Sequence, residues 1–97
     1  MPRGYIIVTY RKVKDPDKLA AYAKLAGPAV AASGGKLLVR GLPAETHELG
    51  LKERTVVMEF ADVAAASAQY HSAAYQEALR VLSDGAERDI RICEGVA

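Results

Sequence analysis

The sequence predicts an α+β fold in which one antiparallel sheet carries helices on a single face. Segments rich in β-branched and aromatic residues alternate with longer, alanine-rich segments of helical periodicity. Their order is strand, helix, strand, strand, helix, strand, which is the order of a ferredoxin-like domain. The chain has 97 residues, and this length suits one such domain over residues 1–97.

The first strand is expected at residues 4–11, GYIIVTYR, and a helix is expected to follow it. Asp15 suits the N-cap of that helix, and Pro16 suits its first position. Because proline costs about 3 kcal/mol inside a helix, Gly27–Pro28 predicts a kink or a break. Gly34–Gly35 is expected to end the segment, with one glycine in the left-handed conformation.

The middle of the chain predicts a hairpin built from strands at residues 36–42 and 53–60. Gly41 and Pro43 indicate a bulge or bend, because proline cannot donate to a strand ladder. The weakly alternating stretch AETHEL, residues 44–49, could continue the first of these strands.

The last third of the chain predicts a helix and a closing strand. Residues 61–87 are rich in alanine, with Asp62 as the expected N-cap and Asp84–Gly85 as the terminator. Residues 88–95 alternate between charged and apolar side chains and are expected to close the chain as a strand.

Two of the predicted strands, 4–11 and 53–60, are apolar on both faces. A sheet with helices on one side should be polar on the other, so a second copy of the chain is the expected cover. We expect a two-fold homodimer with an interface of roughly 1,200–2,000 Å² or more. Its centre is expected to draw on one of two sets, either Tyr5, Ile7, Val56 and Met58, or Ile6, Val8 and Val57.

The order and spacing of several short stretches resemble one bacterial family. They are Gly4–Tyr5, Tyr22, Gly34–Gly35 leading into Leu38-Val39-Arg40-Gly41, Val56-Val57-Met58-Glu59-Phe60, Tyr70, Ser72, Tyr75-Gln76 and Glu94-Gly95. The chain resembles the family catalogued as domain of unknown function 1330, within the dimeric α/β-barrel superfamily, over nearly its whole length. The resemblance implies a ferredoxin-like subunit whose sheet pairs with that of a partner, and it implies no reaction. The family often has a proline after the serine that matches Ser72, whereas Ala73 stands here.

Composition narrows the classes of function. The chain has 13 Lys and Arg against 12 Asp and Glu, with no basic stripe, so we expect no nucleic-acid partner. The single cysteine, Cys93, leaves no internal disulfide or Cys-based zinc site and fits a cytoplasmic location. We expect no cofactor, and the apolar runs are too short for a membrane span.

His71 lies between Tyr70 and Tyr75 on the last expected helix and is one catalytic candidate. An imidazole that moves protons needs a second polar group to orient it, and the local sequence supplies none. The preferred interpretation is that Tyr75 packs in the core with its hydroxyl at the edge, while His71 lies at the surface.

Arg40 and Glu59 each interrupt an apolar strand of the expected hairpin. A charge on a buried strand is costly unless it is paired, and the register is expected to bring the two together. The pair would be a structural ion pair, or else an anion site with Arg40 as the clamp and Glu59 as the base.

Glu45 and His47 could offer two metal ligands on one strand face. Because two ligands without a third are a weak signal, we expect a solvated hairpin and no metal site there. The sequence also carries no Ser-His-Asp pattern and no phosphate-binding glycine loop.

The preferred function is a small-molecule-binding or accessory domain without turnover. The alternative is a cofactor-independent enzyme, monooxygenase- or isomerase-like, that moves a proton on a carbonyl-type substrate through Arg40 and Glu59, or through His71. In either case the ligand pocket is expected between the sheet and the helices. Its expected lining is Tyr5, Tyr22, Arg40, Glu59, Tyr70 and Tyr75.

Overall fold

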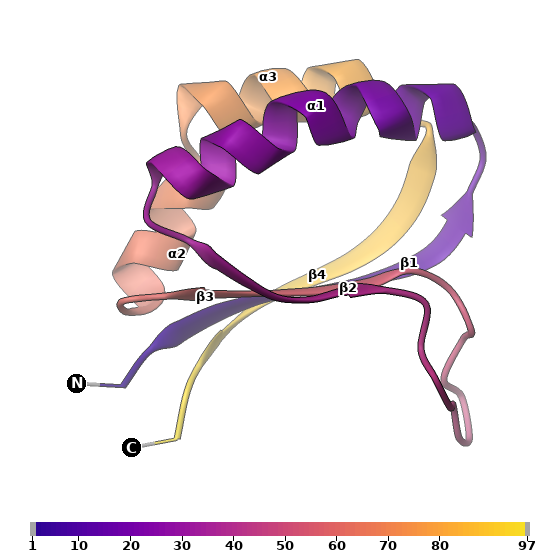
Figure 1. Cartoon of the computed structure of the whole chain (residues 1–97), viewed down its shortest axis with the longest axis horizontal. Helices are drawn as coiled ribbons and strands as arrows, with labels where there is room; N and C mark the ends of the chain where they lie inside the picture. The colour runs from indigo at the N-terminus through magenta and orange to yellow at the C-terminus, as the bar shows by residue number, and fades with distance from the viewer. Residues whose placement is uncertain (1, 97) are drawn as a thin grey trace.

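The computed structural model describes residues 2–96, so Met1 and Ala97 of the domain expected over residues 1–97 lie outside the described residues. A four-stranded sheet carries three helices on one face, as Figure 1 shows. In chain order the elements are β1 (Gly4–Val13), α1 (Pro16–Ala32), β2 (Lys36–Gly41), β3 (Thr55–Phe60), α2 (Val63–Tyr70), α3 (Ala73–Leu82) and β4 (Ala86–Glu94). The expected α+β fold is confirmed.

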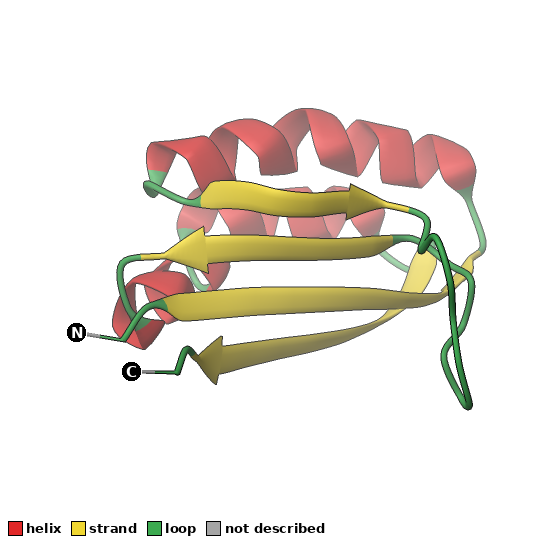
Figure 2. Cartoon of the chain, turned by 60° about the horizontal axis from the view of Figure 1, so that its bottom comes forward, coloured by secondary structure: helices red, strands yellow, loops and turns green. Residues whose placement is uncertain are grey.

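The strands lie side by side in the order β2-β3-β1-β4, and all neighbours are antiparallel (Figure 2). Residues directly opposite each other in such a ladder point to the same face of the sheet. One face, which we call the covered face, packs against the helices and holds Ile6, Val8, Tyr10, Val56, Met58, Phe60, Arg88, Ile90 and Ile92. The other, the open face, holds Tyr5, Ile7, Thr9, Thr55, Val57, Glu59, Asp89, Arg91 and Cys93.

Helix α1 begins as the sequence predicts, because the Asp15 carboxylate accepts hydrogen bonds from the amides of Asp17 and Lys18 at 3.0 and 3.2 Å. Of the kink or break expected at Gly27–Pro28, the break is wrong, because α1 runs through Pro28 as one helix. Pro28 is exposed, so its ring meets solvent, while packing against α3 on either side keeps the helix together. Gly34 has a φ of 78°, which confirms the left-handed terminator.

The single helix expected between residues 61 and 87 is wrong, because the segment forms α2 and α3 with a break at His71–Ser72. Ser72 has extended backbone angles, and its hydroxyl accepts the Tyr75 amide at 3.2 Å while donating to the Gln69 carbonyl at 2.8 Å. Serine therefore ends one helix and caps the next without a proline.

Residues 42–54 form a long irregular segment, which we call the arm; it extends from the sheet on the side away from the helices (Figure 1). The expected continuation of β2 through residues 44–49 is wrong, since this stretch lies in the arm. Leu42, Leu49 and Leu51 on the arm are 69%, 96% and 51% exposed. No helix among the described residues is long and apolar enough to cross a membrane.

Candidate functional site

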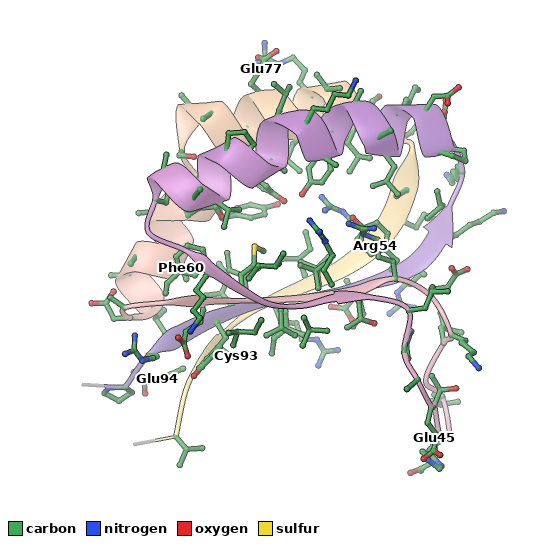
Figure 3. The ribbon with its side chains drawn as sticks, viewed as in Figure 1. Glu45, Arg54, Phe60, Glu77, Cys93 and Glu94 are labelled. Carbon is green, nitrogen blue, oxygen red and sulfur yellow. The ribbon has the colours of Figure 1, made fainter. Side chains whose placement is uncertain are left out.

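A cavity of about 200 Å³ lies between the covered face and α1. Small and apolar side chains from both layers form most of its lining, together with three arginines and three tyrosines. The polar residues are Tyr10, Tyr22, Arg40, Arg54, Tyr75 and Arg88. Within residues 2–96 no carboxylate lines the cavity, and the Arg54 side chain lies between the sheet and α1 (Figure 3).

The arginines of the cavity differ from every other arginine in the chain. The other four each lie within 4.0 Å of a carboxylate, in the pairs Arg3–Glu59, Arg11–Asp89, Arg80–Glu77 and Arg91–Asp89. Among the described residues, no carboxylate pairs with Arg40, Arg54 or Arg88. Since a guanidinium stays protonated at any physiological pH, the cavity holds positive charge that the protein leaves unneutralised.

Arg54, Tyr10 and Arg88 form a row across three strands at one end of the cavity. Arg88 lies directly opposite Tyr10, and the Tyr10 amide donates to the Arg54 carbonyl at 3.0 Å. The two guanidinium carbons lie 6.0 and 5.6 Å from the centre of the Tyr10 ring. The Nε of Arg54 is buried and has no hydrogen-bond partner among the described residues.

Two tyrosines from the helix layer complete this end of the cavity. Arg88 donates from Nη1 to the Tyr22 hydroxyl at 3.1 Å, and the hydroxyls of Tyr22 and Tyr75 lie 2.6 Å apart. Burial raises the pKa of the Tyr22 hydroxyl, and the neighbouring Tyr75 raises it further, although Arg88 opposes this. Tyr22 is therefore a neutral hydrogen-bonding group rather than a base.

The sequence profile of one family, described as "Domain of unknown function (DUF1330)", matches residues 3–96. The chain belongs to the DUF1330 family. No curated protein matches it. The resemblance read from the short stretches is thus confirmed, and the family description assigns no activity.

Solved structures with the same fold share little sequence with this DUF1330 chain. A protein of unknown function from Rhodopseudomonas palustris has a TM-score of 0.72 at 18% identity, covering 99% of this chain and 84% of the other. A protein from Caulobacter crescentus, provisionally named an antibiotic biosynthesis monooxygenase, has a TM-score of 0.64 at 18% identity, with 99% and 92% covered. A dimeric ferredoxin-like protein from Thermobifida fusca has a TM-score of 0.63 at 16% identity, with 96% and 91% covered.

Three of the six residues expected to line the pocket do line it, namely Tyr22, Arg40 and Tyr75. The other three do not. Tyr5 and Glu59 lie on the open face, where the Tyr5 hydroxyl donates to the Glu59 carboxylate at 3.0 Å. Tyr70 packs against the Tyr75 ring at 5.4 Å between centroids, outside the cavity lining.

The expected contact between Arg40 and Glu59 is wrong, because their side chains lie on opposite faces of the sheet. Leu37 lies opposite Met58, but Val39 lies opposite Val57, so β2 carries one extra residue between these two pairs. Such a bulge moves every following side chain to the other face. Arg40 therefore lies opposite Val56 and reaches the cavity instead.

The interpretation of His71 as a surface residue is confirmed. His71 is exposed at the end of α2, and its Nδ1 lies 2.9 Å from the Ser67 carbonyl oxygen. Tyr75 is 2% exposed, and its hydroxyl reaches Tyr22 at the edge of the second core cluster.

Tyr10, Arg54 and Arg88 are site residues that the sequence reasoning missed. Each continues a period-two series of apolar residues, Tyr10 and Arg88 within their strands and Arg54 directly before β3, and this series is a usable signal. The three series are Ile6-Val8-Tyr10, Arg54-Val56-Met58-Phe60 and Arg88-Ile90-Ile92. Each series has a polar or aromatic side chain at one end, and the strand order brings these three ends together.

The remaining candidates lie away from the cavity. His47 Nε2 lies 2.6 Å from the Glu45 carboxylate on the exposed arm, and no cluster of three metal-binding side chains occurs within residues 2–96. Cys93 is half-buried on the open face, on the opposite side of β4 from Ile92.

Neither set expected at the centre of a dimer interface lies wholly on the open face. Val56 and Met58 lie opposite Val8 and Ile6 on the covered face, so they belong to the core rather than with Tyr5. The alternative set fails for the same reason, because Val57 points away from its two companions. The apolar side chains of the open face are Tyr5, Ile7 and Val57, joined by Val39 from β2.

Proposed function

We propose that this DUF1330 protein binds a small organic anion in the cavity between the covered face and α1. One observation carries the proposal: three arginines line the cavity, and none is paired with a carboxylate in the part of the chain that the structure describes. Guanidinium groups recognise carboxylates and phosphates through charge-assisted hydrogen bonds. The sequence favoured a small-molecule-binding function, and the arginines indicate that the small molecule is an anion.

A purely structural role for these arginines fits the chain less well. The tyrosine rings beside Arg54 and Arg88 offer favourable cation–π contacts, but they bring no negative charge. Keeping unpaired charges and a buried, unpartnered donor costs free energy that a ligand could recover.

The test is isothermal titration calorimetry, in which sodium benzoate is added to the dialysed wild-type protein and to two variants. Arg54→Gln removes the charge at the row of Arg54, Tyr10 and Arg88, and should weaken binding by about tenfold or more, the cost of losing a charged hydrogen bond. Arg80→Gln is the matched control, because Arg80 pairs with Glu77 on the outer side of α3. The Arg80→Gln variant should bind benzoate with the affinity of the wild type.

Loss of affinity in both variants would point to a general charge effect and would count against the cavity. Absence of heat with benzoate, and equally with acetate and phosphate, would overturn anion binding altogether. Native mass spectrometry of the undialysed protein adds an independent measurement, since a retained anion would appear as a discrete added mass.

A second candidate function is proton transfer on a carbonyl-type substrate without a cofactor. The hydroxyl pair of Tyr22 and Tyr75, held by Arg88, supports it, because a neutral phenol can donate a proton to a developing oxyanion. Glu59 and His71 lie outside the cavity, so this enzyme would use tyrosine rather than the base expected from the sequence. Turnover of a bound anion by the wild type, lost in Tyr22→Phe while the anion still binds, would distinguish it from simple binding.

We further propose that the chain forms a homodimer through its open face. Two of the solved neighbours are described as dimeric. The open face presents Tyr5, Ile7 and Val57 half-buried, and the arm beside it exposes Leu42 and Leu49. A hollow of about 610 Å³ lies between the arm and the polar end of this face, and a second copy is the occupant we propose for it.

We also propose a cytoplasmic location, as expected from the sequence. The single cysteine supports it, because a reducing compartment keeps a lone thiol reduced. Fractionation of cells that express the tagged chain would test it, and recovery with a membrane pellet or in culture medium would count against it.

A further inference from the structure

The cavity has a polar end and an apolar end, and its ligand should have both. The row of Arg54, Tyr10 and Arg88 defines the polar end. Met58 and Leu37, which lie opposite each other on β3 and β2, define the apolar end. Val30 from α1 also lines the cavity. Arg54, directly before β3, is four positions from Met58, which is roughly 13 Å at the rise of an extended chain.

Volume limits the ligand to about one ring and its acid group. A cavity of about 150 Å³ is enough to hold benzene. The cavity here measures about 200 Å³, which leaves room beyond the ring for little more than a carboxylate. A long-chain fatty acid would have to extend out of the cavity, and free phosphate would satisfy the arginines but leave the apolar end empty.

Small side chains form most of the wall that α1 contributes, and Tyr22 and Val30 are its larger members. Ala23, Ala26, Gly27 and Ala31 line the cavity with side chains no longer than a methyl group. A planar ring needs less space between such a wall and the sheet than a ring with axial hydrogens does. The Met58 sulfur and the tyrosine rings also make favourable contacts with aromatic rings.

We propose that the cavity takes a single-ring aromatic carboxylate, with the carboxylate toward Arg54 and Arg88 and the ring toward Met58 and Leu37. This inference rests on the proposed binding of an organic anion and names its chemical class. Arg40, which is exposed, would meet the ligand at the rim.

The ligand enters between α1 and the edge strand β2. The exposed residues of the lining are Ala23, Gly27 and Ala31 on α1, and Leu37 and Arg40 on β2. A Cβ added at Gly27 would meet no atom within 4 Å, and this glycine does not need a left-handed backbone. A larger side chain at position 27 should therefore preserve the fold, and should even favour the helix, while narrowing the entrance.

The first experiment compares four probes by calorimetry on the dialysed wild-type protein: benzoate, cyclohexanecarboxylate, benzamide and inorganic phosphate. Benzoate should bind about tenfold or more tightly than each of the others, because each lacks the planar ring, the charge or the apolar part. If cyclohexanecarboxylate or phosphate binds best and Arg54→Gln weakens it, the aromatic class is overturned while anion binding stands. If no anion binds, both proposals fail.

The second experiment tests the entrance with Gly27→Leu and with Ala21→Leu as the matched control. Ala21 is an exposed residue of α1 outside the cavity lining. Both variants should have wild-type circular dichroism, but only Gly27→Leu should lose benzoate affinity, by about tenfold or more. Unchanged affinity in a folded Gly27→Leu variant would overturn the proposed entrance.

Discussion

The two faces of the sheet differ in whether their arginines are paired with carboxylates. On the open face, Arg91 donates to both oxygens of Asp89 at 3.1 and 3.0 Å, and the Tyr5 hydroxyl donates to Glu59. The hydrogen bonds from Arg91 hold the pKa of the Asp89 carboxyl below its usual range. On the covered face, by contrast, Arg54 and Arg88 have tyrosine rings as neighbours and no carboxylate partner among residues 2–96.

This difference suits the two faces to different kinds of partner. The open face has neutralised its charges and still exposes apolar side chains, which is what an interface with another copy needs. The covered face packs most of its apolar side chains against the helices, although Leu37 stays exposed, and still holds positive charge, which is what an anion site needs. The first is completed by a protein surface and the second by a small ligand.

The largest expected effect comes from Met58→Asp. Met58 is 6% exposed on the covered face, so the new carboxylate would be buried in the core without a partner. We expect a loss of about 3–5 kcal/mol in the free energy of unfolding, enough to unfold much of a small domain. Chemical denaturation followed by circular dichroism measures it, and a variant as stable as the wild type would show that the faces are assigned wrongly.

Val57→Asp, one residue earlier on β3, is the matched variant for the open face. Val57 lies between Ile7 and Val39, so a carboxylate there would meet two apolar neighbours and the proposed second copy. We expect a folded chain that sediments as a monomer, because burying an unpaired charge in the interface costs several kcal/mol of association. Ala74→Asp, on the exposed side of α3, is the control and should leave the dimer intact. A Val57→Asp chain that still sediments as a dimer would exclude the open face as the interface.

The elements that the sequence predicts correctly are those set by local patterns. Asp15 caps α1, and Gly34 terminates it, because both act through their own backbone neighbours. The four strands follow from alternation and β-branched content. The break at Ser72 was missed because a serine can cap a helix or lie within it, and only the packing of both halves decides between the two.

The site was harder to predict because it depends on register and strand order. The bulge near Leu38 decides which face Arg40 occupies, and nothing in KLLVRGL places the bulge there rather than at Gly41. Arg54 and Arg88 are 34 positions apart in the sequence and join one row only because β1 lies between β3 and β4. Tyr22 and Tyr75 were anticipated because each lies on a helical stripe that had to face the sheet.

A smaller effect is expected from Gln69→Met on the covered side. Gln69 is 1% exposed, and neither its Oε1 nor its Nε2 has a hydrogen-bond partner among the described residues. Methionine has a similar length and no polar group to desolvate, so the free energy of unfolding should rise by about 1–2 kcal/mol. Thermal and urea denaturation measure it. A loss of stability would mean that the Gln69 amide makes a hydrogen bond in the folded protein.

The smallest effect concerns two tyrosines whose pKa values are raised on opposite faces for different reasons. A hydrogen bond to Glu59 is the main cause that raises the pKa of Tyr5, whereas burial is the main cause for Tyr22. Glu59→Gln should therefore return the pKa of Tyr5 toward 10, the usual value for tyrosine, and leave Tyr22 unchanged.

Ultraviolet absorbance of tyrosinate against pH, with Tyr5→Phe and Tyr22→Phe to assign the two transitions, measures both pKa values. A folded-state pKa above the unfolded value means that the stabilising contribution is complete below about pH 10 and is lost as the pH rises through the folded pKa. Both tyrosines should thus weaken the fold only in strong alkali, and Glu59→Gln should move only the transition of Tyr5. A shift of Tyr22 in Glu59→Gln would mean that the two faces are electrostatically coupled through the sheet, and the contrast between them would then be one of degree.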